Sequence, residues 1–321
     1  MKRLVAVFAI FAFSQLAVPA NAGIDTVNKI PVVISQIAVA VDSSAGKLYV
    51  ASSSENSISM VKEATLKVTP VAGYSSMPLA MAVDESTHLL YVTNQVSNDI
   101  SVIDGSSNSV SRIIDVDDPF HGTSDLAGIA IDSSRHRLYV TNFQAGQLLV
   151  FDTFEQTLIK AVSLDACVND VEVDPTTGLI YVANADKKTM SVISSVSLTV
   201  KAKVSVGAQP GSIAIDSTAK KAYVANAGAN TVSVIDLKTN RVVQTVKVGK
   251  EPISVAVRPS TKEVYVANFS GNSVTVISTK YYSVVRTITG GKNPRSTAAS
   301  QLTGAIYVAN MGSNKIWKIG N

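Results

Sequence analysis

An acidic segment near residue 120 holds the side chains best suited to bind a cation. Carboxylates and an imidazole are ligands for hard or borderline cations, but their spacing here matches neither an EF-hand loop nor a zinc motif. The alternative, which we favour, is a solvated loop whose Asp and Gly residues set its turns. We therefore predict no metal site and no cofactor. As tentative ligand-binding residues the segment contributes Asp117, Asp118, Phe120, His121 and Asp125.

Basic and aromatic residues form a second group of candidates. A basic groove with aromatic faces can hold an anionic ligand or stack single-stranded bases. The alternative is that these lysines are simply solvated, as lysines on loops usually are. The tentative ligand-binding residues of this group are Phe143, Lys187, Lys188, Lys250, Phe269, Lys292 and Arg295.

Signatures of catalysis are absent from the sequence. It contains no Gly-x-Ser-x-Gly elbow, no His-Glu-x-x-His, no phosphate-binding loop and no Cys-x-x-Cys-His haem site. Two of the three histidines, His88 and His136, stand three residues before a tyrosine, and we expect them to face away from the candidate site. We therefore predict no catalytic residues and favour a binding protein over an enzyme.

A repeat of about 42 residues organises the chain. Seven Tyr-Val pairs follow one another at intervals of 42, 48, 42, 42, 42 and 42 residues, and six of them are followed two positions later by Asn. Seven copies at so steady a period indicate a repeat architecture. The aligned tyrosines are Tyr49, Tyr91, Tyr139, Tyr181, Tyr223, Tyr265 and Tyr307.

Each copy has the pattern of four short strands. In the fifth copy we expect strands at residues 212–215, 221–225, 231–235 and 242–248, which are β-branched runs bounded by turn residues. In the first five copies an Asp stands seven residues before the tyrosine, where its carboxylate can accept hydrogen bonds from turn amides. Four strands in each copy of this length are typical of a propeller. The sequence therefore predicts an all-β, seven-bladed β-propeller with four antiparallel strands per blade.

The two ends of the chain complete the ring. The seventh copy stops after its third strand, Lys315–Ile319, and residues 24–33 have the composition of the missing fourth strand. We expect this N-terminal strand to complete the C-terminal blade, which closes the ring and covers an exposed sheet edge. The predicted blades are residues 35–76, 77–124, 125–166, 167–208, 209–250, 251–292, and 293–321 together with 23–34.

Propeller geometry places the candidate residues on one face of the ring. The loops from fourth to first strands and from second to third strands gather there around the central channel, and we call this the funnel face. The six extra residues of the second interval fall in such a loop, because residues 117–128 replace the link seen as residues 249–254. An insertion on the binding side of a regular ring favours a role in binding.

The repeated asparagines allow two interpretations. Their carboxamides could form a ring over the channel, or they could make turns, because Asn tolerates left-handed backbone and bonds neighbouring amides. We favour turns, both for the Asn that ends each Tyr-Val motif and for a second set four residues later: Asn56, Asn98, Asn230, Asn272 and Asn314.

The first 22 residues have the parts of a secretory signal peptide. Lys2 and Arg3 precede an apolar run to Val18, and small residues end at Ala22. The run is shorter than the ~20 residues of a spanning helix. We expect cleavage after Ala22, no transmembrane segment in the mature chain, and a periplasmic or extracellular location.

The net charge and the cysteine content limit which classes of partner are expected. Without Lys2 and Arg3 the chain has 26 basic and 24 acidic residues, a net charge of +2, which is a poor argument for a nucleic-acid partner. Cys167 is the single cysteine, and we interpret it as a small buried hydrophobe.

The motifs themselves resemble a known family. The runs YVTNQVSNDISVID (91–104), YVANAGANTVSVID (223–236) and YVANFSGNSVTVIS (265–278) are similar to the YVTN family of bacterial and archaeal β-propeller repeat proteins, over essentially all of the mature chain. The resemblance implies a propeller in an extracytoplasmic setting. It implies no reaction, since family members occur in surface layers, in the periplasm and beside quinone-dependent oxidation systems.

Three functions remain open at this point. The first is a non-catalytic platform that binds a protein or small-molecule partner through its funnel face, as a monomer. The second is a metal-assisted hydrolase or lyase of the propeller lactonase type, and the third is a structural repeat protein of the cell envelope.

Overall fold

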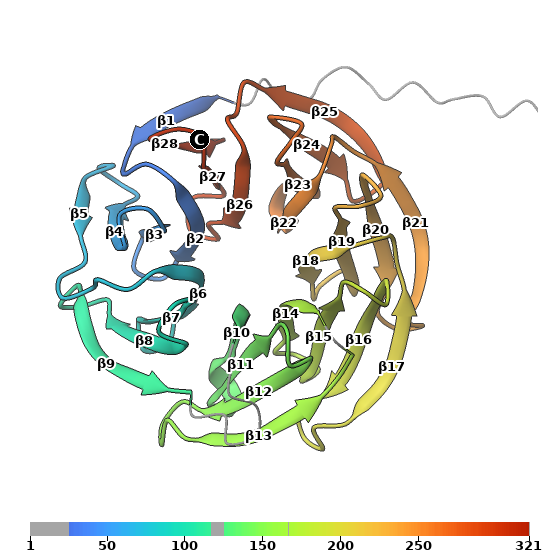
Figure 1. Ribbon diagram of the computed structural model, residues 1–321. Helices are drawn as coiled ribbons and strands as arrows, with labels where there is room; N and C mark the ends of the chain where they lie inside the picture. Colours follow the sequence, from blue (N-terminus) through green and yellow to red (C-terminus); the bar gives the residue numbers. More distant parts are fainter. Residues whose placement is uncertain (1–25, 117–124, 166, 321) are drawn as a thin grey trace, which may run out of the picture.

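The chain folds into a closed ring of seven four-stranded antiparallel sheets, the blades of a β-propeller (Figure 1). The structure is a computed structural model that describes residues 26–116, 125–165 and 167–320. In each blade the strands follow the sequence from the channel outward, except that the outermost strand of the last blade is β1. The predicted fold class is confirmed. The predicted signal peptide, residues 1–22, lies outside the described residues.

The inner two strands of each blade build the channel wall and the core. The innermost strands are β2 (Gln36–Asp42), β6 (Pro78–Asp84), β10 (Leu126–Asp132), β14 (Val168–Asp174), β18 (Pro210–Asp216), β22 (Pro252–Arg258) and β26 (Pro294–Ala299). The second strands are β3 (Lys47–Ser52), β7 (Leu89–Asn94), β11 (Arg137–Asn142), β15 (Leu179–Asn184), β19 (Lys221–Asn226), β23 (Glu263–Asn268) and β27 (Ile306–Asn310).

The outer two strands complete each blade. The third strands are β4 (Ser57–Lys62), β8 (Asp99–Asp104), β12 (Gln147–Asp152), β16 (Thr189–Ser194), β20 (Thr231–Asp236), β24 (Ser273–Ser278) and β28 (Lys315–Ile319). The fourth are β5 (Val68–Pro70), β9 (Ser109–Asp115), β13 (Leu158–Ser163), β17 (Val200–Ser205), β21 (Arg241–Lys247), β25 (Ser283–Thr289) and β1 (Val27–Pro31). Short 3₁₀ turns, η1 (Ser133–Arg135) and η2 (Pro259–Thr261), join first to second strands in two blades. Within the described ranges, no helix has the length and apolar character needed to cross a membrane.

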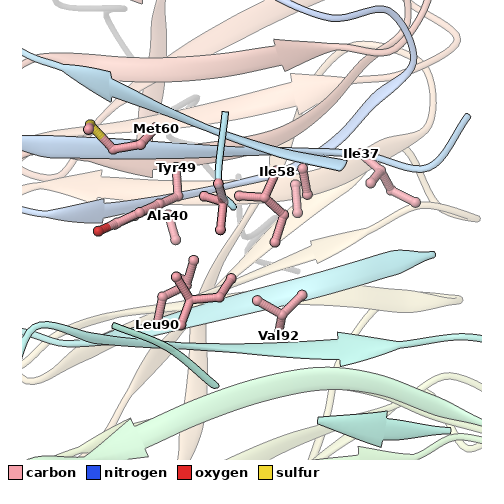
Figure 2. Packing of buried hydrophobic residues seen from close by; sticks show 11 residues of the cluster. Ile37, Ala40, Tyr49, Ile58, Met60, Leu90 and Val92 are labelled. Carbon is pink, nitrogen blue, oxygen red and sulfur yellow. The ribbon is translucent and has the colours of Figure 1, made fainter. Parts of the chain in front are cut away.

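The repeated tyrosines hold neighbouring blades together. All seven are buried, and the buried apolar side chains form seven clusters, each between two adjacent blades. In the cluster between the first two blades, Tyr49 and Ile58 of one blade face Leu90 and Val92 of the next (Figure 2). The second strands read as continuous apolar runs because both of their faces are covered by neighbouring sheets. One blade therefore cannot form its core without its neighbours.

The N-terminal strand closes the ring as expected. β1 pairs antiparallel with β28, with Val27 opposite Ile319 and Lys29 opposite Trp317. Its bounds, Val27–Pro31, lie inside the predicted segment 24–33. In the fifth blade the first three strands are longer than predicted, and β18 begins at Pro210, two residues before the expected start. The fourth strand, β21, has the predicted length but begins one residue earlier.

Aspartates end the inner strands of the first five blades and bind the turns that follow, as predicted. The Asp42 carboxylate accepts a hydrogen bond from the backbone amide of Ala45 at 2.9 Å, and Asp216 accepts one from Ala219 at 2.8 Å. The side chain therefore supplies the acceptor that a tight turn needs.

The two sets of asparagines have different roles. In the second set, Asn56, Asn98, Asn230 and Asn272 adopt left-handed backbone, as predicted, and Asn314 does not. The Asn that ends the second strand in six of the blades is instead buried in extended backbone, so the turn interpretation is wrong for that set. Asn226, for example, donates to the hydroxyls of Thr231 and Ser233 and accepts from the backbone amide of Gly207. Its carboxamide therefore links the second strand to the third strand and to Gly207, which precedes the first strand of the same blade.

Arg258 replaces the turn aspartate in the sixth blade and organises an ion cluster. Its guanidinium donates to Glu263 at 2.7 Å and to the carbonyl of Gly304 in the seventh blade at 3.0 Å. Arg286 also donates to Glu263, at 2.6 Å. Burial alone would raise the pKa of Glu263, but hydrogen bonds from Arg286, Arg258 and Tyr265 lower it to about 2. The cluster links the sixth blade to the seventh, next to the ring closure.

Replacing Glu263 with Gln is expected to destabilise the protein by about 3 kcal/mol at pH 7, because two partly buried guanidinium groups lose their counterion. The folded pKa of this carboxyl lies below its unfolded value of 4.5, so its contribution is present above that value and is lost as the pH falls toward 2. Urea unfolding at pH 7 and pH 3 measures both effects. Asp236→Asn, which breaks the more exposed pair with Lys221, is the control and should cost less than about 1 kcal/mol. An equal cost of Glu263→Gln at both pH values would contradict the electrostatic explanation.

Candidate functional site

The central channel forms a cavity of about 880 Å³. Its wall consists of the second to sixth residues of the innermost strands, or the second to fifth in β14, and turn residues at the funnel face continue it. Each innermost strand is the inner edge of its sheet, as Figure 1 shows. A volume of this size lies in the range of small-molecule sites. The residues at the funnel-face end are Phe143, Cys167, Ala185, Asp186, Gln209 and Ala227.

The fourth blade departs from the repeat on the channel wall. The fifth residue of the innermost strand is Ala in six blades, and in the fourth blade it is Glu172. The third residue is Ala, Gly or Ser in six blades, and in the fourth blade it is Asp170. Both side chains line the channel from β14. Two carboxyl groups therefore stand where the repeat places small neutral residues.

Asp170 occupies the place of a structural serine. In the next three blades the serine hydroxyl at this position accepts a hydrogen bond from a backbone amide of the following blade, as Ser254 does from Thr297 at 3.0 Å. Asp170 accepts in the same way from the amide of Ile213 at 2.8 Å. A Cβ on Gly128 would lie 2.7 Å from the Cα of Asp170, so only glycine fits beside it. Burial raises the pKa of Asp170 to about 6, although hydrogen bonds from Ile213, Val171 and Ser212 oppose the shift.

Glu172 has fewer compensating contacts. Its carboxylate accepts a hydrogen bond from the backbone amide of the next residue, Val173, at 3.2 Å. Burial, and next the charge of Asp170, raise the pKa of Glu172 to about 8. The pair therefore retains a proton near neutral pH, because two nearby carboxylates resist ionising together.

Arg295 is the positively charged residue of the channel wall. It is the second residue of β26, at a position where the other six blades have uncharged residues. Burial lowers the pKa of its guanidinium. Among the described residues no ion pair or hydrogen bond joins this guanidinium to another side chain or to the backbone. The group is therefore available to an anion that enters the channel.

The structure gathers only part of the predicted set of binding residues. Phe143 and Arg295 line the channel, and Asp125 lies beside Phe143, whose amide donates to the Asp125 carbonyl at 2.8 Å. Four lysines lie in funnel-face turns with exposed side chains and do not line the channel: Lys187, Lys188, Lys250 and Lys292. Phe269 is half-buried in another of these turns and does not line the channel either. Asp117, Asp118, Phe120 and His121 lie outside the described residues.

The prediction for Cys167 is wrong, and the prediction for His88 and His136 is confirmed. The interpretation of Cys167 as a buried hydrophobe is wrong, because it is half-buried at the mouth of the channel with left-handed backbone. A hydrogen bond to Asp186 raises the pKa of its thiol. His88 and His136 lie in turns after the innermost strands, at the face opposite the funnel face, as predicted. There His88 Nδ1 lies 2.8 Å from Asp42 Oδ2.

Asp170 and Glu172 were not among the residues selected from the sequence. The signal that could have found them is the alignment of the seven copies, in which each is the single charged residue at its position of the innermost strand. Within the described part of the chain, no three His, Cys, Asp or Glu side chains are grouped as a metal site would require.

The blades and their channel define the protein as a seven-bladed propeller with a ligand-sized central cavity. The chain belongs to the family described as "Lactonase, 7-bladed beta-propeller", whose model matches residues 35–196. Among solved structures, hydrazine synthase from Kuenenia stuttgartiensis is similar with a TM-score of 0.78 and 19% identity, over 89% of this chain and 96% of that chain. That likeness shows the fold alone. No curated protein matches the chain.

Proposed function

We propose that this protein is an exported propeller of the YVTN type that binds a ligand or partner through its funnel face without catalysing a reaction. The observation that carries the proposal is the central cavity, whose largely neutral wall bears a guanidinium with no partner among the described residues and two carboxyl groups with raised pKa values. Charged and titratable groups with shifted pKa values in a concave site are typical of ligand recognition. The basic, apolar and small-residue pattern of residues 1–22 supports export.

A large side chain at the mouth of the channel is expected to abolish binding. Ala227 lines the mouth from the turn after β19, so Ala227→Trp should obstruct entry, while Ala229→Trp places the same indole on an exposed position of the same turn. Native mass spectrometry and pull-down with the mature protein should show a ligand or partner retained by the wild type and by Ala229→Trp, and at least about tenfold less of it on Ala227→Trp. Equal retention by all three proteins, or no retention by the wild type, would contradict the proposal.

A second candidate function, hydrolysis of a lactone, is favoured by the family match. Glu172 could then act as a proton donor near neutral pH and Asp170 as a base, because carboxyl groups with separated pKa values divide these roles. Lactone hydrolysis followed with and without added Mg²⁺ distinguishes the two functions. Turnover that is lost in Glu172→Ala would establish the enzyme and replace the first proposal.

A further inference from the structure

Opposite charges stand on opposite sides of the channel. Arg295 lies on β26 and the carboxyl groups of Asp170 and Glu172 lie on β14, with the inner strands of two blades between them on one side of the ring and of three on the other. Figure 1 shows these two strands across the central opening from each other. Burial lowers the pKa of Arg295 without a contribution from a carboxylate, and no arginine contributes to the pKa values of the two acids. Within the described part of the chain, no ion pair joins Arg295 to either acid, so the two groups remain separate across the channel.

The fold does not need these charges. Six blades form the same inner strand with Ala in place of Glu172, and three of them have Ser in place of Asp170. A partly buried charge without a partner is unfavourable, because it has lost water and gained no counterion. Each of the two groups would be stabilised by a ligand group of opposite charge. Their separation requires those ligand groups to be well apart on one molecule.

The geometry points to an elongated zwitterion as the ligand of this channel, and this inference rests on the proposed binding function. We propose that its carboxylate pairs with Arg295 and that its ammonium pairs with Asp170 and Glu172. A guanidinium can donate two parallel hydrogen bonds to a carboxylate. The ammonium group donates three hydrogen bonds, which suits two neighbouring carboxyl groups that both line the channel. An ω-amino acid or a short peptide with free ends has this arrangement of charges.

Three probes of equal chain length test the two charge contacts separately. 6-Aminohexanoate has both charged groups, hexanoate lacks the ammonium and hexylamine lacks the carboxylate. Calorimetric titration of the mature wild-type protein should show that 6-aminohexanoate binds at least about tenfold more tightly than either single-charge probe, since each charge-assisted contact contributes a factor of that order.

Substituting a residue of the protein should have the same effect on affinity as removing the charged group of the probe that this residue contacts. Arg295→Gln should weaken 6-aminohexanoate at least about tenfold and leave hexylamine unchanged. Glu172→Ala should weaken 6-aminohexanoate similarly and leave hexanoate unchanged, and it introduces the residue that the other six blades have at this position. Arg241→Gln, the same substitution on the exposed start of β21, should change none of the three affinities.

Several results would overturn the inference. Hexanoate or hexylamine binding as tightly as 6-aminohexanoate would show that one charge contact does not operate. Equal losses for all three probes in a variant would show that the residue acts on the structure of the channel. If none of the probes binds while the wild type retains another ligand, this inference fails and the proposed binding function stands. If the wild type retains nothing at all, the binding function itself fails.

Discussion

Removal of β1 is expected to open the ring and to lower the free energy of unfolding by more than about 4 kcal/mol. The strand provides five paired positions along β28, and its Ile30 is 2% exposed in the cluster between the seventh and first blades. Without it, the edge of β28 faces solvent and the cluster that contains Trp317 loses the packing of Val27, and an unpaired edge promotes association with other chains. Chemical denaturation and size-exclusion chromatography of a variant lacking Val27–Pro31 measure both consequences.

Two further variants keep this prediction testable if the shortened chain does not fold. Ile30→Ala removes the buried anchor and keeps the backbone pairing, so it should cost about 2–4 kcal/mol. Lys29→Ala changes an exposed side chain of the same strand and should alter stability by less than about 0.5 kcal/mol. Unchanged unfolding of the variant without β1 would mean that this strand does not close the ring.

The architecture could be predicted because it is repeated. One copy of the Tyr-Val motif is a weak signal, but seven copies at a nearly constant period admit few folds. The missing strand of the last copy then required an N-terminal partner, and β1 fills that place. Asp42 and its equivalents could also be assigned, because their side chains act on the next few residues of the chain. Features that depend on the local sequence or on the repeat period could therefore be predicted from the sequence.

The candidate site was harder to predict for a physical reason. Function depends on what differs between copies, and Asp170 and Glu172 look like ordinary polar residues of an alternating strand until the copies are compared. The funnel-face lysines, such as Lys187 and Lys250, were selected because they sit in the right loops. Side chains at loop tips extend into water, however, and the channel wall is made by the inner strands. Arg295 was found because it lies at the start of an inner strand, next to such a loop.

Replacing Asp170 with Ser and Glu172 with Ala together is expected to stabilise the protein at alkaline pH. These substitutions give the fourth blade residues that other blades have at the same positions, and the serine keeps an acceptor for the amide of Ile213. In the folded protein burial raises the pKa values to about 6 and about 8, above the ordinary values of 3.8 and 4.5. The folded state therefore holds protons that the unfolded chain has already released. Stability falls as the pH rises through this window, and the loss is complete about one unit above the higher pKa, near pH 9.

The double variant should thus be more stable than the wild type by on the order of 3 kcal/mol at pH 8.5, and nearly equal to it at pH 4.5. Urea unfolding of both proteins at these two pH values measures the difference, and the comparison cancels groups that the proteins share. Glu263 titrates below this window in the folded state, so it does not interfere. A difference of the same size at both pH values would assign the effect to packing instead of ionisation. A variant less stable than the wild type at pH 8.5 would mean that the carboxyl groups support the fold, and their presence would then need no ligand to explain it.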